Sequence, residues 1–223
     1  KDYNKVNIYP SSITLASIGL GLLWFGWFGF NAGSALSANG VAGFAFLVTN
    51  TAGAVGGIVW MIIEWWITKK PTMLGLISGI VAGLGAITPA SGYVDLSGAI
   101  LIGFIAGIIG YLGVTVVKRT FKYDDSLDAF GIHGFCGIWG TIAAGLFATV
   151  TVNKDGANGL FYGNGKQALI QLLAIAVTIV YSAIGTTVIY YISSLITRGA
   201  RVKEDVEEKG LDEAVHGEKG FHL

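Results

Sequence analysis

A single histidine, His133, lies inside an uncharged stretch that runs from residue 129 to residue 153. That stretch is long enough to cross a lipid bilayer, which takes about 20 apolar residues. A titratable ring within a membrane span is costly unless it faces protein or a cavity. An imidazole can accept a hydrogen bond from an N–H group or pass a proton. His133 is therefore the first candidate for a functional residue.

Small residues and an aspartate surround this histidine. Asp128 precedes His133 by five residues, a turn of about 500° on an α-helix, so the two side chains do not share a face and a direct pair is not expected. The position of Asp128 at the start of the apolar run predicts an N-cap, and Asp124 and Asp125 are expected in a solvated loop. Glycines that recur every third residue would let a neighbouring helix or a narrow lumen approach the backbone: Gly131, Gly134, Gly137 and Gly140.

Aromatic rings and a hydroxyl are gathered near the end of the first apolar run, from Trp24 through Trp27 and Phe30 to Ser34. One interpretation is an aromatic belt at the membrane interface, which composition favours for Trp24. The other is a mouth in which π-faces attract a small cation and the Ser34 hydroxyl offers it a hydrogen bond. Spacing alone does not choose between them.

A third apolar run contains two overlapping GxxxG units, formed by Gly75, Gly79 and Gly83. Helix packing is the simplest interpretation of such glycines. Pro89 is expected to end this helix. The hydroxyl of the preceding Thr88 could line a cavity at the break, although this stretch alone favours packing.

The elements that position these residues are predicted to be membrane helices. The 223 residues are 53% hydrophobic and only 13% charged, with a mean hydropathy of +0.65, whereas soluble domains carry about 25% charge. No charged residue lies between Lys5 and Glu64, so this interval must hold two helices, joined by a turn at 31–40. The uncharged runs predict an all-α bundle with six spans: 12–34, 41–66, 72–90, 96–117, 129–151 and 168–197.

Lysines and arginines follow the second, fourth and sixth predicted spans, which places the three clusters on one side of the membrane. The positive-inside rule assigns that side, and the C-terminus, to the cytoplasm. Glu64, next to Trp65 and Trp66, is interpreted as part of an interfacial anchor. Residues 1–200 are thus predicted to form a transmembrane domain, and the polar residues 201–223 a solvated tail that contains His216 and His222.

The sequence lacks the motifs of several common kinds of functional site. It has no phosphate-binding loop, dinucleotide fingerprint or HExxH zinc motif. Its single cysteine, Cys136, cannot form an intrachain disulfide. No nucleophile–base pair or metal-ligand set can be assembled, so an enzyme, a cofactor, a metal site and nucleic-acid binding are all unexpected.

Taken together, the longer motifs resemble the ammonium transporter family (Amt, with its Mep and Rh relatives). The resemblance rests on the segments 27–35, 88–93 and 128–141, and it continues into the polar tail at Gly210, Leu211 and Asp212 and at His216, Gly217 and Glu218. It implies a homotrimer with one pore in each subunit. Each subunit would have eleven helices in two inverted repeats, of which this chain matches helices six to eleven, the second repeat and the closing helix.

The resemblance also implies roles for individual pore residues. Ser34 would belong to an outer ammonium recruitment site, and Phe30 would be one of two stacked rings that gate the pore. Trp27 and Thr88 would line or border the lumen. His133 would be the second of two paired pore histidines.

Outside the lumen, the resemblance implies that Asp128 supports the pore structurally and that the tail contacts PII-type regulatory proteins. The family's first pore histidine, its second gate phenylalanine and its recruitment-site tryptophan belong to the first repeat, helices one to five, which is expected as a partner for these residues.

The function that follows is transport of ammonium or ammonia across the cell membrane by a multi-pass protein with a cytoplasmic C-terminus. Ammonium would be recruited outside and deprotonated, and ammonia would pass along the pore histidines. Two alternatives stay open. One is a sensor that binds ammonium and signals through its tail, and the other is a passive channel for neutral solutes, although the paired Asn-Pro-Ala loops of aquaporins are absent.

Overall fold

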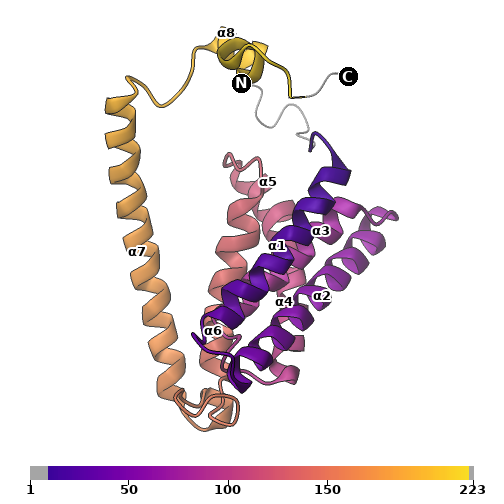
Figure 1. Ribbon diagram of the computed structural model, residues 1–223, viewed down its shortest axis with the longest axis vertical. Helices are drawn as coiled ribbons and strands as arrows, with labels where there is room; N and C mark the ends of the chain where they lie inside the picture. The colour runs from indigo at the N-terminus through magenta and orange to yellow at the C-terminus, as the bar shows by residue number, and fades with distance from the viewer. Residues whose placement is uncertain (1–9, 221–223) are drawn as a thin grey trace. The chain divides into compact units, whose positions relative to one another are not determined.

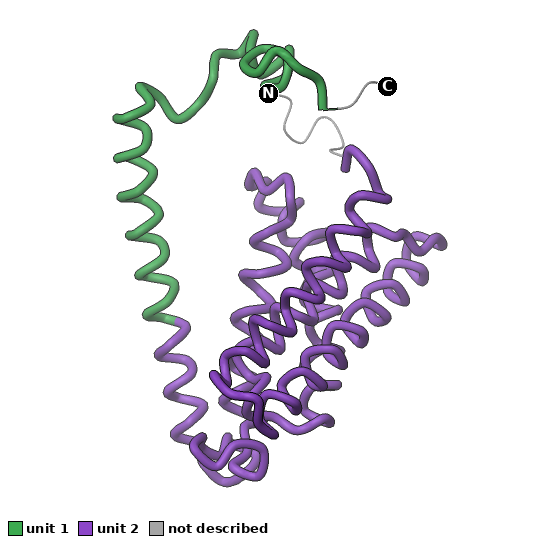
Figure 2. The backbone as a smooth tube through the Cα atoms, in the orientation of Figure 1, with its two compact units in different colours: residues 1–5, 176–223 green, residues 6–175 purple. Residues whose placement is uncertain are grey.

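The computed structural model describes residues 10–220, which are helical and contain no strand (Figure 1). Two compact units can be distinguished, residues 6–175 and residues 1–5 with 176–223 (Figure 2), and each is described by itself. The α-helices are α1 (Ile13–Gly33), α2 (Gly40–Thr68), α3 (Met73–Ile87), α4 (Leu96–Leu112), α5 (Lys118–Phe121), α6 (Phe135–Phe147), α7 (Gly165–Ile196) and α8 (Glu204–Lys209). Three π-helical turns, η1 (Gly113–Val117), η2 (Phe130–Gly134) and η4 (Asp212–His216), and one 3₁₀ turn, η3 (Leu160–Tyr162), complete the described elements.

Five helical stretches in the described residues are long and apolar enough to cross a membrane. They are α1, α2, α4 continued by η1 and α5, η2 continued by α6, and α7. The remaining predicted span, 72–90, corresponds to α3, which has only 15 residues. It is shorter than predicted because the helix ends at Ile87, before Pro89, as the ring of proline requires.

Polar residues at the predicted turns start the helices. Asn39 accepts a hydrogen bond from the backbone N–H of Ala42 (2.9 Å) at the start of α2. Asp95 accepts one from Gly98 (2.7 Å) at the start of α4. Each side chain satisfies a backbone donor that has no partner inside its helix. The predicted turn at 31–40 is confirmed, since α1 ends at Gly33 and α2 begins at Gly40.

The core of residues 6–175 is built by close packing of α2, α3 and α4. A Cβ atom placed on Gly79 would lie 2.7 Å from the carbonyl oxygen of Gly56, and one placed on Gly83 would overlap the carbonyl of Ala52. On the α4 side, a Cβ atom on Gly103 would lie 2.5 Å from the same Ala52 oxygen. Only glycine allows such approaches between helices. The packing interpretation of the GxxxG units is thereby confirmed.

The turn between α2 and α3 gives Glu64 a structural role, and its interpretation as part of an interfacial anchor stays a prediction. Its carboxylate accepts hydrogen bonds from the backbone N–H of Thr72 (2.9 Å) and from the Thr72 hydroxyl (3.0 Å). Thr72 in turn caps α3 by accepting from the N–H of Gly75 (2.9 Å). Glu64 therefore joins the end of one helix to the start of the next, a role that its neighbouring tryptophans and lysines did not indicate.

The second unit contains the distal part of α7, then α8 and η4. The polar tail, expected to be solvated, is exposed and also forms these two short helical turns. Arg201 forms an ion pair with Glu207 (3.0 Å), and Lys219 lies 3.8 Å from Glu213. His222 lies outside the described residues.

Candidate functional site

Trp27 links the two helices that carry most of the candidate residues. Its indole Nε1 donates a hydrogen bond to the Thr88 hydroxyl oxygen at 2.8 Å. The Thr88 hydroxyl donates in turn to the carbonyl oxygen of Leu84, also at 2.8 Å. Thr88 is the C-cap of α3. The position at which α3 ends, just before Pro89, therefore fixes where the indole of Trp27 is held along the α1–α3 contact. Thr88 thus orients the Trp27 ring, a role that the sequence did not indicate. It also lines a cavity, which the sequence pattern had made the less favoured interpretation.

The rings of Phe30, Trp27 and His133 follow one another across the site. Phe30 meets Trp27 edge to face, with ring centroids 6.2 Å apart and an angle of 67° between the planes. His133 lies parallel to Trp27, with centroids 6.3 Å apart and planes within 3°. Gly85 of α3 lies beside the imidazole, because a Cβ atom at that position would be 3.9 Å from Nδ1. Residues from α1, α3 and η2 are therefore brought together.

A cavity of about 170 Å³ lies at the Phe30 end of this row of rings. Ser34 donates its hydroxyl proton to the carbonyl of Phe30 at 2.7 Å, which leaves the hydroxyl oxygen free to accept from an N–H donor. Thr88, which the sequence analysis named as a candidate, is among the polar residues of this cavity, whereas Asn153 was not identified because it comes from a distant loop. The lining residues are Phe30, Asn31, Ser34, Ala35, Val41, Ala45, Thr88, Ser91, Gly92, Tyr93 and Asn153.

A buried polar pair fixes α1 against α2 beside the cavity. The Asn31 side-chain amide donates to the Thr49 hydroxyl at 2.9 Å, and both residues are at most 5% exposed. A buried amide that lost this partner would pay the cost of desolvation. The presence of an asparagine within an apolar run was the signal for such a pair.

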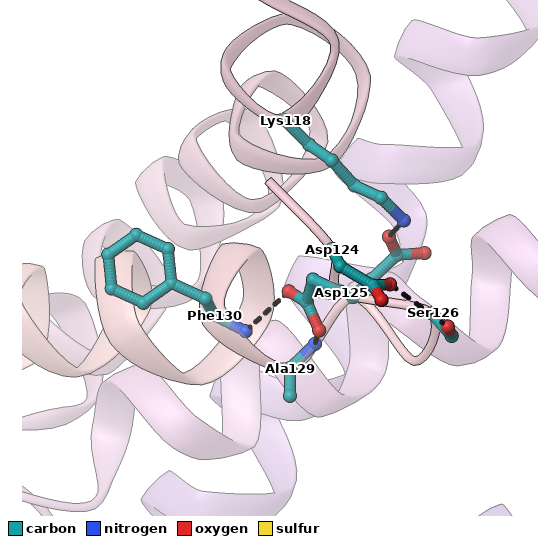
Figure 3. Close-up of polar contacts among 7 residues, drawn as sticks. Lys118, Asp124, Asp125, Ser126, Ala129 and Phe130 are labelled. Carbon is teal, nitrogen blue, oxygen red and sulfur yellow. Dashed lines mark hydrogen bonds and ion pairs between the residues drawn. The ribbon is translucent and has the colours of Figure 1, made fainter. Parts of the chain in front are cut away.

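The predicted N-cap at Asp128 is wrong, and Asp125 takes that role (Figure 3). The Asp125 carboxylate accepts hydrogen bonds from the backbone N–H of Ala129 (2.9 Å) and Phe130 (2.8 Å). Asp128 instead forms an ion pair with Lys118 at 2.6 Å, with a left-handed backbone (φ 57°) that turns its carboxylate away from the helix start. Asp125 is thus a structural residue rather than part of a freely solvated loop.

The three rings of this row differ in how far they are exposed. His133 and Phe30 are exposed in this chain, whereas Trp27 is half-buried. Trp24, one helical turn before Trp27, has its indole N–H buried and lies near Gly53 of α2, and the aromatic-belt interpretation stays a prediction for this residue. Among the glycines near His133, Gly131 and Gly140 contact α4–η1 and α3 respectively.

The candidate tail residues lie in the second unit. Gly210 and Gly217 have positive φ angles (91° and 71°) and flank η4, and the N–H of Glu218 donates to the carbonyl of Asp212 at 3.2 Å. Gly210, Leu211, Asp212, His216, Gly217 and Glu218 therefore surround one short turn. In residues 10–220, no group of three acidic, histidine or cysteine side chains could hold a metal ion.

Comparison with known proteins places this arrangement in a family. The model of the Ammonium Transporter Family matches residues 1–221. The ammonium transporter of Bacillus subtilis is 52% identical over 212 residues, which are 95% of this chain and 52% of that protein. The crystal structure of Saccharomyces cerevisiae Mep2 superposes with a TM-score of 0.83 and 35% identity, covering 88% of this chain and 45% of that one.

A further solved structure, described as a sensor Amt protein, superposes with a TM-score of 0.80 and 32% identity over 92% of this chain and 49% of that one. The chain therefore spans about half the length of the proteins that it matches. The relatives are transport proteins and not enzymes. The sequence match, the helical fold and the expected resemblance agree, and the chain belongs to the ammonium transporter family as a multi-pass membrane protein.

Proposed function

We propose that these residues form one half of a pore that conducts ammonium or ammonia across the cell membrane. Residues 1–200 would be its transmembrane part and residues 201–223 its cytoplasmic regulatory tail. The observation that carries the proposal is the row of rings from Phe30 through Trp27 to His133, which begins at a polar cavity. Such a row offers a cation a π-face first and a hydrogen-bonding ring deeper in the membrane.

The cavity is suited to recruit an ammonium ion. The ion would contact the face of Phe30, since aromatic faces attract cations within about 6 Å of the ring centre. The Ser34 oxygen would accept one of its N–H bonds. The Ser34 hydroxyl donates its own proton to the Phe30 carbonyl, so the oxygen lone pairs stay available to accept.

Beyond Phe30 the proposed passage would disfavour an ion. A charge moved from water into an apolar passage pays a heavy desolvation cost, which neutral ammonia avoids. Ammonium would therefore give up its proton near Phe30, and ammonia would pass His133, whose ring can accept or donate a hydrogen bond. The charge moved per molecule of methylammonium, recorded on reconstituted membranes, distinguishes a proton that returns outside from one that follows along the histidines.

The exposed rings support a partner for this half. A titratable ring that faced lipid would be costly, and His133 is exposed in this chain. The likeness to proteins of about twice this length supports helices one to five of the same transporter as that partner. The homotrimer and a PII-type regulatory protein at the tail are proposals that rest on the family resemblance.

The test uses the full-length transporter in cells that lack their own ammonium uptake. Replacing His133 by alanine is expected to lower methylammonium uptake at least tenfold, about 1.4 kcal/mol in transition-state terms, at equal amounts of folded protein. Thr51→Ala serves as the matched control, because the Thr51 hydroxyl donates within its own helix to Leu47. Normal uptake by the His133 variant would remove this residue from the transport route.

A sensor is the second candidate, favoured by the likeness to a solved sensor Amt protein. In that case the tail would carry a signal and transport would be minor. Deleting the residues after Arg201 separates the two functions. A transporter should keep uptake in the full-length protein or change it in rate, whereas a pure sensor should show no uptake with or without the tail.

A further inference from the structure

We propose that Lys118 is a positioning residue for His133 and that it acts through Asp128. The proposal rests on the function proposed above, in which His133 meets the transported molecule. Lys118 lies ten positions before Asp128 and near the end of the preceding helical stretch, Leu96–Phe121. Nothing in the spacing of the sequence joins it to the histidine.

The ion pair between Lys118 and Asp128 is short and partly shielded from water. Lys118 Nζ lies 2.6 Å from Asp128 Oδ1, and the two side chains are 21% and 27% exposed. Charge-assisted hydrogen bonds of this length are about twice as strong as neutral ones. Partial burial also reduces the screening that makes exposed pairs weak.

The pair holds a backbone conformation that is unfavourable without support. Asp128 has a φ of 57°, in the left-handed region where a side chain crowds the following carbonyl. Such residues persist when the surrounding contacts determine them, and they cluster at functional sites. The next contacts along the chain are helical, because the N–H of Ile132 donates to the carbonyl of Asp128 at 2.9 Å. The conformation at Asp128 therefore sets the direction in which η2 begins.

His133 lies inside η2, and η2 packs on η1, the π-helical turn that immediately precedes Lys118. A Cβ atom on Gly113 of η1 would lie 3.0 Å from the carbonyl oxygen of Gly131 in η2. The π-helical turns η1 and η2 are thus held together by the close contact between Gly113 and Gly131 and by the ion pair that follows η1 and precedes η2. Single π-helical turns are frequent at functional sites. A π-helical turn contains an extra residue and rotates the side chains that follow it.

The parallel stack of Trp27 and His133 depends on that rotation. The two planes agree within 3°, and a change in the path of η2 would turn the imidazole away from the indole. The recruitment cavity, which contains Ser34 and Phe30, would be unaffected because η2 contributes no lining residue to it. Loss of the ion pair should therefore slow passage without weakening recruitment.

The experiment measures methylammonium uptake by the full-length transporter, normalised to the folded protein seen by size-exclusion chromatography. Lys118→Met is expected to lower the maximal rate about tenfold, since one charge-assisted hydrogen bond is worth about that factor. The KM should stay within about twofold. Lys118→Arg, which keeps the charge and a donor, should restore most of the rate. Arg119→Met is the control, because Arg119 is the exposed neighbour of Lys118.

An unchanged maximal rate for Lys118→Met, or a fall that only matches a loss of folded protein, would overturn the proposal. A second measurement does not need transport. A cryo-electron microscopy structure of the full-length Lys118→Met variant should show His133 rotated out of its parallel stack with Trp27, and an unchanged stack would contradict the positioning role. Absence of uptake by the wild-type protein would reject the proposed function instead.

Discussion

Helices α1 and α3 are both rich in glycine, and their glycines meet opposite surroundings. In α3, Cβ atoms at Gly75, Gly79 and Gly83 would overlap or closely approach residues of α2. In α1, no described atom outside the adjoining helix backbone lies within 4 Å of the Cβ position at any of five glycines: Gly19, Gly21, Gly26, Gly29 and Gly33. Small residues allow close approach in both helices. The difference indicates that α3 finds its partner inside this chain and that the open face of α1 is available to a partner outside it.

The largest effect is expected where the glycine contact is closest. Gly83→Val would press a branched side chain against the Ala52 carbonyl, and overpacking of this kind costs about 1–3 kcal/mol or more. Thermal unfolding of the full-length transporter in detergent measures the loss. Ala157→Val, at an exposed position of the 148–164 loop, is the control. Equal melting temperatures for the two variants would show that α2 and α3 are not packed as described.

A smaller effect is expected on the open face of α1. A Cβ atom at Gly26 meets no described atom outside its own stretch of helix, so we attribute the cost of Gly26→Val to helices outside this chain. We expect a loss of about 1 kcal/mol in the full-length protein, measured in the same unfolding assay. Equal melting temperatures for Gly26→Val and the unsubstituted protein would mean that this face of α1 meets only lipid. The difference between α1 and α3 would then not indicate a partner for α1.

The smallest effect concerns a polar tie between the two compared helices, the hydrogen bond from Trp27 to Thr88. Trp27→Phe, Thr88→Val and the double variant form a thermodynamic cycle. Their coupling energy in the unfolding assay should be about 0.5 kcal/mol, the low end of the range for a hydrogen bond, because this bond is only partly buried. Additive losses would show that the two side chains act independently and that α3 does not orient the indole.

Helix positions could be read from the sequence because each depends on local residues. The uncharged runs gave helices within a few residues of those observed, and Pro89 marked the end of α3. The predicted turn at 31–40 contained the Asn39 cap. Hydrophobic length and capping chemistry are enough for such features.

Contacts between distant residues could not be read in the same way. Asp128 stood at the right place for an N-cap, but Lys118 and a left-handed backbone redirected its carboxylate. Glu64 binds Thr72 across a turn between two helices. Trp24 was interpreted as a belt residue by composition, and its contact with Gly53 of α2 was not foreseen. Each of these outcomes depends on how helices meet, which spacing along one helix does not contain.

The proposed function depends most on the surroundings of His133. A cryo-electron microscopy structure of the full-length transporter in a lipid nanodisc, with ammonium present, tests them directly. The proposed function predicts that the imidazole lines a passage continuous with the cavity at Phe30 and Ser34. An imidazole that faces lipid, or that is sealed between side chains with no passage beside it, would contradict the account.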